Sequence, residues 1–238
     1  MTTGVVTLGE TMGLFRAAEL GSLAHVTDFK LGIGGAESNV AIGVARLGTP
    51  STWIGRVGAD GLGDRVVREL RAESVTVVAT VDGSASTGLM VKEQRTAAAT
   101  RVAYYRSVSA GRNLSVDDLP AGLIEGAQLL HVTGITAALS DSARAALHTA
   151  IDRAHDAGVP VSFDVNHRNA LWRGRDASAE YRDIAARSHI VFAGLDEARF
   201  LAHGTDPAAL AAGITRLGPT QVVIKLGEEG CLGVIDGE

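Results

Sequence analysis

The chain has 238 residues, 46% of them hydrophobic and 21% charged, with a formal net charge of −5. This composition supplies enough apolar surface for a folded core and excludes a disordered chain. No stretch reaches the roughly 20 apolar residues of a membrane helix, and no block of like charges indicates a nucleic-acid or membrane surface. Met1–Gly9 lacks the pattern of a secretory signal, and Cys231 is the only cysteine, so we expect a cytoplasmic protein without disulfides or a cysteine-based zinc site.

The first fifty-seven residues predict two buried strands and a helix. Residues 5–8 and 52–57 are short apolar runs, typical of strands covered on both faces. Residues 36–47 carry a helical pattern that ends at Gly48. A strand, a helix and a second strand in this order predict an α/β unit.

A different pattern follows near residue 90. Residues 89–93 and 101–106 alternate apolar and polar side chains around a turn over residues 96–100. Such alternation predicts a half-exposed antiparallel hairpin, and residues 29–33 are candidates to join it. We expect a small sheet that projects from the α/β body.

Strands and helices alternate through the second half of the chain. Its strands are predicted as continuous apolar runs, and its helices as amphipathic stretches with capping residues. Ser140 caps the first helix, and Asp206 with Pro207 begins the last one. The alternation predicts a doubly wound α/β sheet. The predicted strands are residues 128–133, 159–165, 190–193 and 221–226, with a further strand before residue 238, and the predicted helices are 140–157, 177–187 and 207–217.

Three glycines precede the helix at residues 36–47, where free N–H groups and the helix dipole favour a polar or anionic ligand. Asn39, in the first turn, offers an amide that can donate to and accept from a hydroxyl. Gly32, Gly34 and Gly35 do not complete the dinucleotide-binding pattern. A nicotinamide-dependent oxidoreductase and a plain turn with helix packing are the alternatives here.

Two tyrosines and an arginine end the predicted hairpin. Because alternate residues of a strand share a face, we expect Tyr104 and Arg106 on one side and Tyr105 on the other. An aromatic hydroxyl beside a guanidinium suits a carboxylate or a polyol. Ordinary cross-strand packing is the alternative.

Polar residues also follow two central strands. Asp164, Asn166 and Arg168 are alternate residues at the carboxyl end of one strand. Open α/β sheets bind ligands in the crevice beyond these strand ends, so we expect the three side chains to converge on one binding site. A structural salt bridge between Asp164 and Arg168 is the alternative. Lys225 ends another strand before a glycine-containing turn, which predicts a phosphate or anion contact.

Taken in order, these motifs resemble the PfkB (ribokinase-like) family of carbohydrate kinases. Within the family the likeness is greatest to the 2-keto-3-deoxygluconate kinases, and it covers nearly the whole chain. The stretches that carry it are Gly34-Gly35-Ala36-Glu37 with Asn39 and Ala41, residues 53–63, Tyr104-Tyr105-Arg106, residues 131–136, and Asp164 to Arg168 followed by Leu171-Trp172.

The resemblance implies a Rossmann-like doubly wound sheet with a small β-sheet lid, in one kinase domain over residues 1–238 with lid strands within residues 10–33 and 87–107. It implies ATP- and Mg2+-dependent phosphorylation of a sugar acid, 2-keto-3-deoxygluconate, to its 6-phosphate, by a homo-oligomer that associates through the lid. Another sugar such as fructose or ribose, or a non-catalytic sugar-acid-binding fragment, is the alternative. Matching residues are Gly34, Gly35, Ala36, Asn39, Tyr104, Tyr105, Arg106 and Arg168 for the substrate, Asn166, Lys225, Gly227 and Gly230 for the nucleotide, and Glu197 for an indirect contact to magnesium.

The chain departs from the family pattern in three places. Gly194 stands where the Asn-x-x-Glu motif has its asparagine, and Met90 stands where some relatives have tyrosine. The family's Gly-Ala-Gly-Asp segment, whose aspartate accepts the hydroxyl proton, is absent from these 238 residues. We therefore expect that aspartate beyond Glu238, and a kinase domain that is incomplete at its C-terminal side.

Overall fold

The computed structural model describes residues 4–96 and 99–236, so positions 97 and 98 of the predicted turn lie outside the described residues. The chain forms two compact units. The first comprises Met1–Val6 and Leu119–Glu238, and the second comprises Thr7–Asp118. Strand β1 (Val5–Leu8) contains the boundary between them. Within the described ranges, no helix has both the length and the apolar character needed to cross a bilayer.

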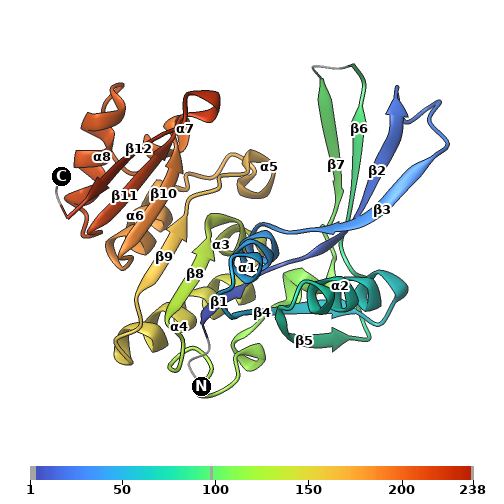
Figure 1. Cartoon of the computed structure of the whole chain (residues 1–238), viewed down its shortest axis with the longest axis horizontal. Helices are drawn as coiled ribbons and strands as arrows, with labels where there is room; N and C mark the ends of the chain where they lie inside the picture. Colours follow the sequence, from blue (N-terminus) through green and yellow to red (C-terminus); the bar gives the residue numbers. More distant parts are fainter. Residues whose placement is uncertain (1–3, 97–98, 237–238) are drawn as a thin grey trace. The chain divides into compact units, whose positions relative to one another are not determined.

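The first unit is built on strands in the order β12-β11-β10-β9-β8, which lie side by side in Figure 1. The pairs from β8 to β11 are parallel, and β12 is antiparallel to β11. Side chains such as Val132, Phe163 and Val191 are fully buried, as expected for strands covered on both faces. The strands are β8 (Leu129–Thr133), β9 (Val161–Asp164), β10 (Ile190–Gly194), β11 (Gln221–Lys225) and β12 (Cys231–Ile235).

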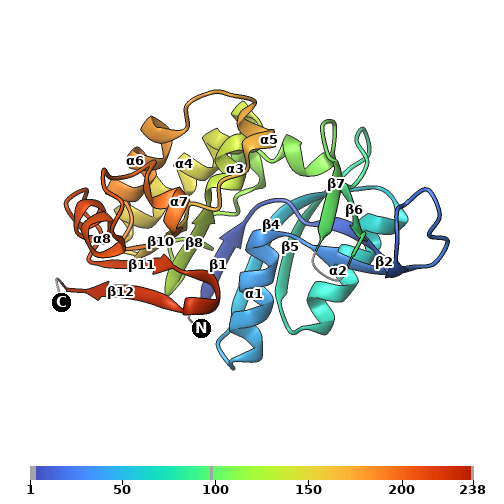
Figure 2. The ribbon, with the colours of Figure 1, turned by 90° about the horizontal axis from the view of Figure 1, so that it is seen from above.

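The three helices that the sequence predicts in this unit begin within one residue of the predicted positions, whereas α3, α5 and α7 were not predicted. Ser140 caps α4, because its Oγ accepts the Ala143 N–H at 3.1 Å. Asp206 caps α8, with Pro207 at the first helical position. Helices α4 and α6 lie side by side, joined by His148 Nε2 and Glu180 Oε1 at 2.8 Å (Figure 2). The helices are α3 (Gly134–Leu139), α4 (Asp141–Asp156), α5 (Asn169–Trp172), α6 (Ser178–Ala186), α7 (Leu195–Ala198) and α8 (Pro207–Thr215).

The second unit combines a parallel strand pair, two helices and a small sheet. Strands β4 and β5 pair in parallel. Helices α1 and α2 pack on a core that contains Trp53, Val66 and Leu70, all fully buried. The sequence did not predict β5 as a strand. The elements are α1 (Ala36–Arg46), α2 (Gly61–Ala72), β4 (Ser51–Gly58) and β5 (Thr76–Asp82).

The small sheet has the strand order β3-β2-β6-β7, and in Figure 1 it extends away from α2, β4 and β5. The predicted hairpin is confirmed, since β6 and β7 pair antiparallel, while β2 pairs antiparallel with β3 and parallel with β6. A side chain at Gly13 would meet Leu62 of α2, and one at Gly34 would meet Met90, so odd and even positions mark two different faces. The strands are β2 (Met12–Leu20), β3 (Phe29–Gly34), β6 (Leu89–Gln94) and β7 (Thr100–Tyr105).

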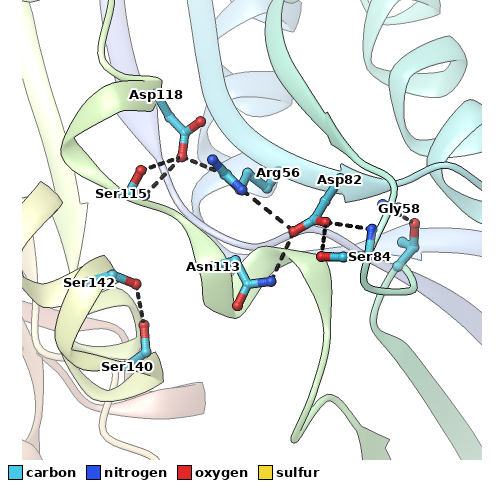
Figure 3. Close-up of polar contacts among 10 residues, drawn as sticks. Arg56, Gly58, Asp82, Ser84, Asn113, Ser115, Asp118, Ser140 and Ser142 are labelled. Atoms are coloured by element: carbon cyan, nitrogen blue, oxygen red, sulfur yellow. Dashed lines mark hydrogen bonds and ion pairs between the residues drawn. The ribbon is translucent and has the colours of Figure 1, made fainter.

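A polar network ties β4 and β5 to the segment that follows the small sheet (Figure 3). Arg56 Nε donates to Asp118 at 2.7 Å, and Arg56 Nη1 lies 3.4 Å from Asp82. Asp82 also accepts from Asn113 Nδ2 at 2.9 Å and from the Ser84 hydroxyl at 2.6 Å. One arginine is thus shared by two buried carboxylates, each of which also accepts hydrogen bonds from neutral donors.

Candidate active site

The predicted residues after β9 do not continue the strand. β9 ends at Asp164, and Asn166 adopts φ +39°, in the left-handed region that asparagine tolerates better than most residues. Arg168 then takes the N-cap position of α5 and is exposed. The prediction that Asp164, Asn166 and Arg168 alternate along one strand is therefore wrong. The turn at Asn166, and not strand alternation, sets the directions of the Asp164, Asn166 and Arg168 side chains.

Asp164 is paired with Lys225, and the predicted alternative of a salt bridge to Arg168 is wrong. Lys225 Nζ lies 2.7 Å from Asp164 Oδ1, and it also lies 3.7 Å from Glu197 Oε2. Burial raises the pKa of Asp164, and the lysine opposes that shift. The ends of β9 and β11 thus place one cation between two carboxylates.

Glu197 holds the turn after β9 against the end of β10. Its Oε1 accepts the His167 N–H at 2.8 Å, and its Oε2 accepts the Gly194 N–H at 2.6 Å. A Cβ at Gly194 would lie 3.2 Å from Glu197 Oε2, so an asparagine here would crowd the carboxylate. Because both oxygens already accept backbone N–H groups, this carboxylate fits magnesium through water better than direct ligation. Within the described ranges, no three histidine, cysteine or acidic side chains group as metal ligands.

A chain of hydrogen bonds fixes His167, between the two predicted ligand residues of the turn. Trp172 Nε1 donates to the Tyr181 hydroxyl at 2.6 Å, and that hydroxyl lies 3.0 Å from His167 Nδ1. His167 Nε2 lies 2.8 Å from Asn169 Oδ1, which can only accept, so the proton of a neutral His167 sits on Nε2. Nδ1 then accepts from the tyrosine hydroxyl, which in turn accepts from the indole. Sequence reasoning missed this role of Tyr181, although Trp172 belongs to the motif that carried the resemblance.

Gly227 begins the 3-10 turn η3 (Gly227–Glu229) between β11 and β12, and Gly230 follows it. Their φ values of +65° and +94° lie in the region that favours glycine. A Cβ at either position would meet no neighbour, so the backbone conformation, and not lack of space, requires glycine. Lys225 and the residues of the turn are exposed, and the predicted phosphate contact stays a prediction.

Residues 34–39 lie in the second unit, where β3 joins α1. Gly35 is the N-cap of α1 in an extended conformation, and a side chain there would overlap the Glu10 carbonyl. Ala36 begins the helix, and Asn39 is exposed on its first turn. Gly34 is buried and Asn39 is exposed, so of the predicted hydroxyl contacts the Asn39 amide is the more accessible one.

Tyr104 and Arg106 come together, whereas Tyr105 does not join them. The Arg106 guanidinium lies 6.0 Å from the centre of the Tyr104 ring. Tyr104 pairs with Met90 on the face that carries Gly34. Tyr105 lines a shallow hollow of about 600 Å³ with leucines of β3, α2 and β6. The expected division of the two tyrosines between opposite faces is confirmed.

Glu10 is the residue that holds Arg106. Its side chain is fully buried and forms an ion pair with Arg106, while the Ser109 hydroxyl donates to it. A side chain at Gly88 or Gly111 would overlap Glu10, so two glycines make room for the acid. Arg106 Nε forms no hydrogen bond with any described residue, and the guanidinium keeps a free donor. The only sequence signal for this pair is an acidic residue two positions after the end of β1.

The model of the pfkB family carbohydrate kinases matches residues 2–238, which makes the nicotinamide alternative wrong. The 2-dehydro-3-deoxygluconokinase of Bacillus subtilis is 36% identical over 97% of this chain and 72% of its own length. The 2-dehydro-3-deoxygluconokinase of Thermoproteus tenax is 34% identical over 95% of this chain and 70% of its own length. A solved PfkB protein from Polaromonas sp. superposes with a TM-score of 0.92 at 35% identity, over 97% of this chain and 79% of its own.

A sugar kinase from Pyrococcus horikoshii, solved in complex with ATP, gives a TM-score of 0.80 at 25% identity, over 98% of this chain and 74% of its own. These structures confirm the predicted α/β class with a large sheet and a small one. The family match extends over both units. The chain therefore belongs to the pfkB family of carbohydrate kinases, which are phosphotransferases that act on sugars.

Proposed function

We propose that this kinase phosphorylates 2-keto-3-deoxygluconate at the 6-hydroxyl. The same acid, written 2-dehydro-3-deoxygluconate, is in the names of its relatives from B. subtilis and T. tenax. The observation that carries the proposal is Arg106. It is held by Glu10, lies beside the Tyr104 ring, and keeps a guanidinium donor without a partner among the described residues. Buried donors are almost always paired, so a ligand with a carboxylate fits this position better than a neutral sugar does.

The remaining residues divide into two roles. The open N-terminus of α1 and the amide of Asn39 would hold hydroxyls, while Arg168 offers a second guanidinium for the keto-acid end. Asn166, Lys225 and the turn from Gly227 to Gly230 would contact the nucleotide. Phosphoryl transfer depends mainly on positioning and on positive charge around the transferred group, and these residues supply both.

ATP and Mg2+ would bind together at the first unit. Lys225 now neutralises Asp164, so a phosphate would compete with that carboxylate for the ammonium. Glu197 would hold magnesium through water, because its oxygens are already engaged by backbone N–H groups. Magnesium would neutralise phosphate charge when bound.

The test combines a coupled phosphorylation assay with calorimetric binding of the acid, and it compares Arg168→Ala with Arg144→Ala. Arg144 lies on α4, where it pairs with Asp141, and serves as the control. Losing a charged contact of about 1.5–3 kcal/mol should lower kcat/KM, or affinity, roughly 10- to 100-fold for Arg168→Ala and leave the control unchanged. Equal use of fructose, or no binding of the acid by the wild type, would contradict the proposal. Binding of the acid without turnover would favour the non-catalytic alternative.

A further inference from the structure

Three cations face one another across the small sheet. Arg16 on β2 is directly opposite Lys30 on β3 and directly opposite Lys92 on β6. Opposed residues of neighbouring strands have Cβ atoms about 5 Å apart, so the three side chains form one row. We call Lys30, Arg16 and Lys92 the basic row. It contains two of the three lysines of the chain.

The basic row belongs to the face that carries the predicted substrate contacts. All three residues occupy even positions, as do Gly34, Met90 and Tyr104. Leu14, Met90 and Tyr104 form the next row on this face. The two rows are two residues apart along each strand, a distance of about 7 Å. The cations therefore lie just beyond Tyr104 on the same surface.

No acidic residue lies directly opposite a member of the basic row on the neighbouring strands. The even positions of β2 from Met12 to Arg16 pair in register with even positions of β3 and β6, and those of β6 pair with β7. None of these positions holds an acidic residue. Glu93 and Arg101 belong to the other face, where they lie 4.0 Å apart. Among the described residues, none forms an ion pair with any member of the row. A chain with net charge −5 thus keeps three unopposed positive charges on one face.

Stability does not account for this arrangement. Like charges directly opposite on neighbouring strands destabilise a sheet. Cations that protect a sheet from aggregation are placed on edge strands, but Arg16 and Lys92 are on the central strands β2 and β6. Only Lys30, on the edge strand β3, could protect an edge, so the two central cations cost stability and are expected to serve binding.

We infer that the basic row attracts the carboxylate of the acceptor sugar and selects an anionic acceptor over a neutral one. The inference rests on the proposed function and adds residues to it. Clustered charge of one sign raises the local concentration of an opposite ion and the rate at which it arrives. The row would act on the approaching acid, and Arg106 on the bound acid.

The experiment measures association rates and calorimetric affinities of 2-keto-3-deoxygluconate for Arg16→Gln, Lys30→Gln, Lys92→Gln and the triple variant. Arg101→Gln is the control, since it removes one charge from the opposite face of the same sheet. We expect the association rate to fall about threefold for each row variant and about tenfold or more for the triple variant at low ionic strength. High salt should remove the differences, because it screens exposed charges.

Two further readouts separate the possible outcomes. Fructose binding should not change, and the Tm of each row variant should stay equal or rise, because repulsion is relieved. Equal losses in Arg101→Gln, losses that salt does not remove, or a changed oligomeric state would overturn the inference while leaving the proposed function intact. If the wild type binds no sugar acid, the proposed function fails and the inference fails with it.

Discussion

At the scale of single residues, the candidate site depends on side chains that are not themselves predicted to contact the substrate or the nucleotide. Tyr181 accepts from Trp172 and donates to His167 Nδ1, while Asn169 Oδ1 accepts from Nε2, where the histidine proton sits. Burial raises the pKa of Tyr181, so the hydroxyl keeps its proton and remains a donor. Since His167 lies between Asn166 and Arg168, the chain of hydrogen bonds positions both.

Replacing Tyr181 by phenylalanine tests this positioning. The substitution keeps the buried ring and leaves Trp172 Nε1 and His167 Nδ1 without their partner. We expect a loss of about 2 kcal/mol in the free energy of unfolding, measured by urea denaturation, because unsatisfied buried polar groups cost about 1–3 kcal/mol each. The control is Tyr105→Phe, whose hydroxyl is exposed, and which should change stability by less than about 0.5 kcal/mol. Equal stability of the two variants would contradict the role of Tyr181.

At the scale of elements, the network around Arg56 joins β4, β5 and the segment after the small sheet. Hydrogen bonds from Asn113 and Ser84, with the charge of Arg56, hold the pKa of Asp82 below its ordinary value. Burial alone would raise the pKa of Asp118, but the hydrogen bonds from Arg56, Thr80 and Ser115 together outweigh burial, and the pKa is lowered. Both carboxylates are therefore more acidic in the folded chain than in the unfolded one.

This shift makes part of the stability dependent on pH. A carboxylate whose folded-state pKa is depressed stabilises the fold at neutral pH, and the contribution is lost as pH falls below about 4, toward the folded-state pKa. Asp82→Asn should lower the free energy of unfolding by about 1–2 kcal/mol at pH 7, and the difference from wild type should shrink in acid. Urea denaturation between pH 7 and pH 3 measures both effects. Asp117→Asn, at an exposed neighbouring position, is the control, and a difference that persists unchanged in acid would contradict the argument.

At the scale of the whole molecule, periodicity and capping predict the α/β alternation, because strands buried on both faces and capped helices leave clear local patterns. The fully buried stripe of α4, from Ala143 to Ala154, and the cap at Ser140 are examples. Pairings between distant residues leave no such pattern. Glu10 meets Arg106, and Lys225 meets Asp164, only once the chain has folded. The left-handed turn at Asn166 likewise overrides the alternation that its sequence suggests.

Ligand binding to the native chain should be visible in the stability of the whole molecule. A ligand at 100 times its Kd adds about 2.7 kcal/mol to the free energy of unfolding. For a protein of this size that corresponds to a rise in Tm of roughly 5–10 °C. We expect this rise with 2-keto-3-deoxygluconate and a smaller one with fructose at the same concentration, because only the acid satisfies the guanidinium groups.

The measurement is a thermal scan at increasing ligand concentration, and it does not depend on turnover. Arg168→Ala should lose most of the rise produced by the acid, while Arg144→Ala should retain it. Salt should weaken the effect of the acid and leave that of fructose unchanged, since only the charged ligand is screened. A larger rise with fructose than with the acid would show that the arginines serve another purpose, and that the acceptor of this kinase is a neutral sugar.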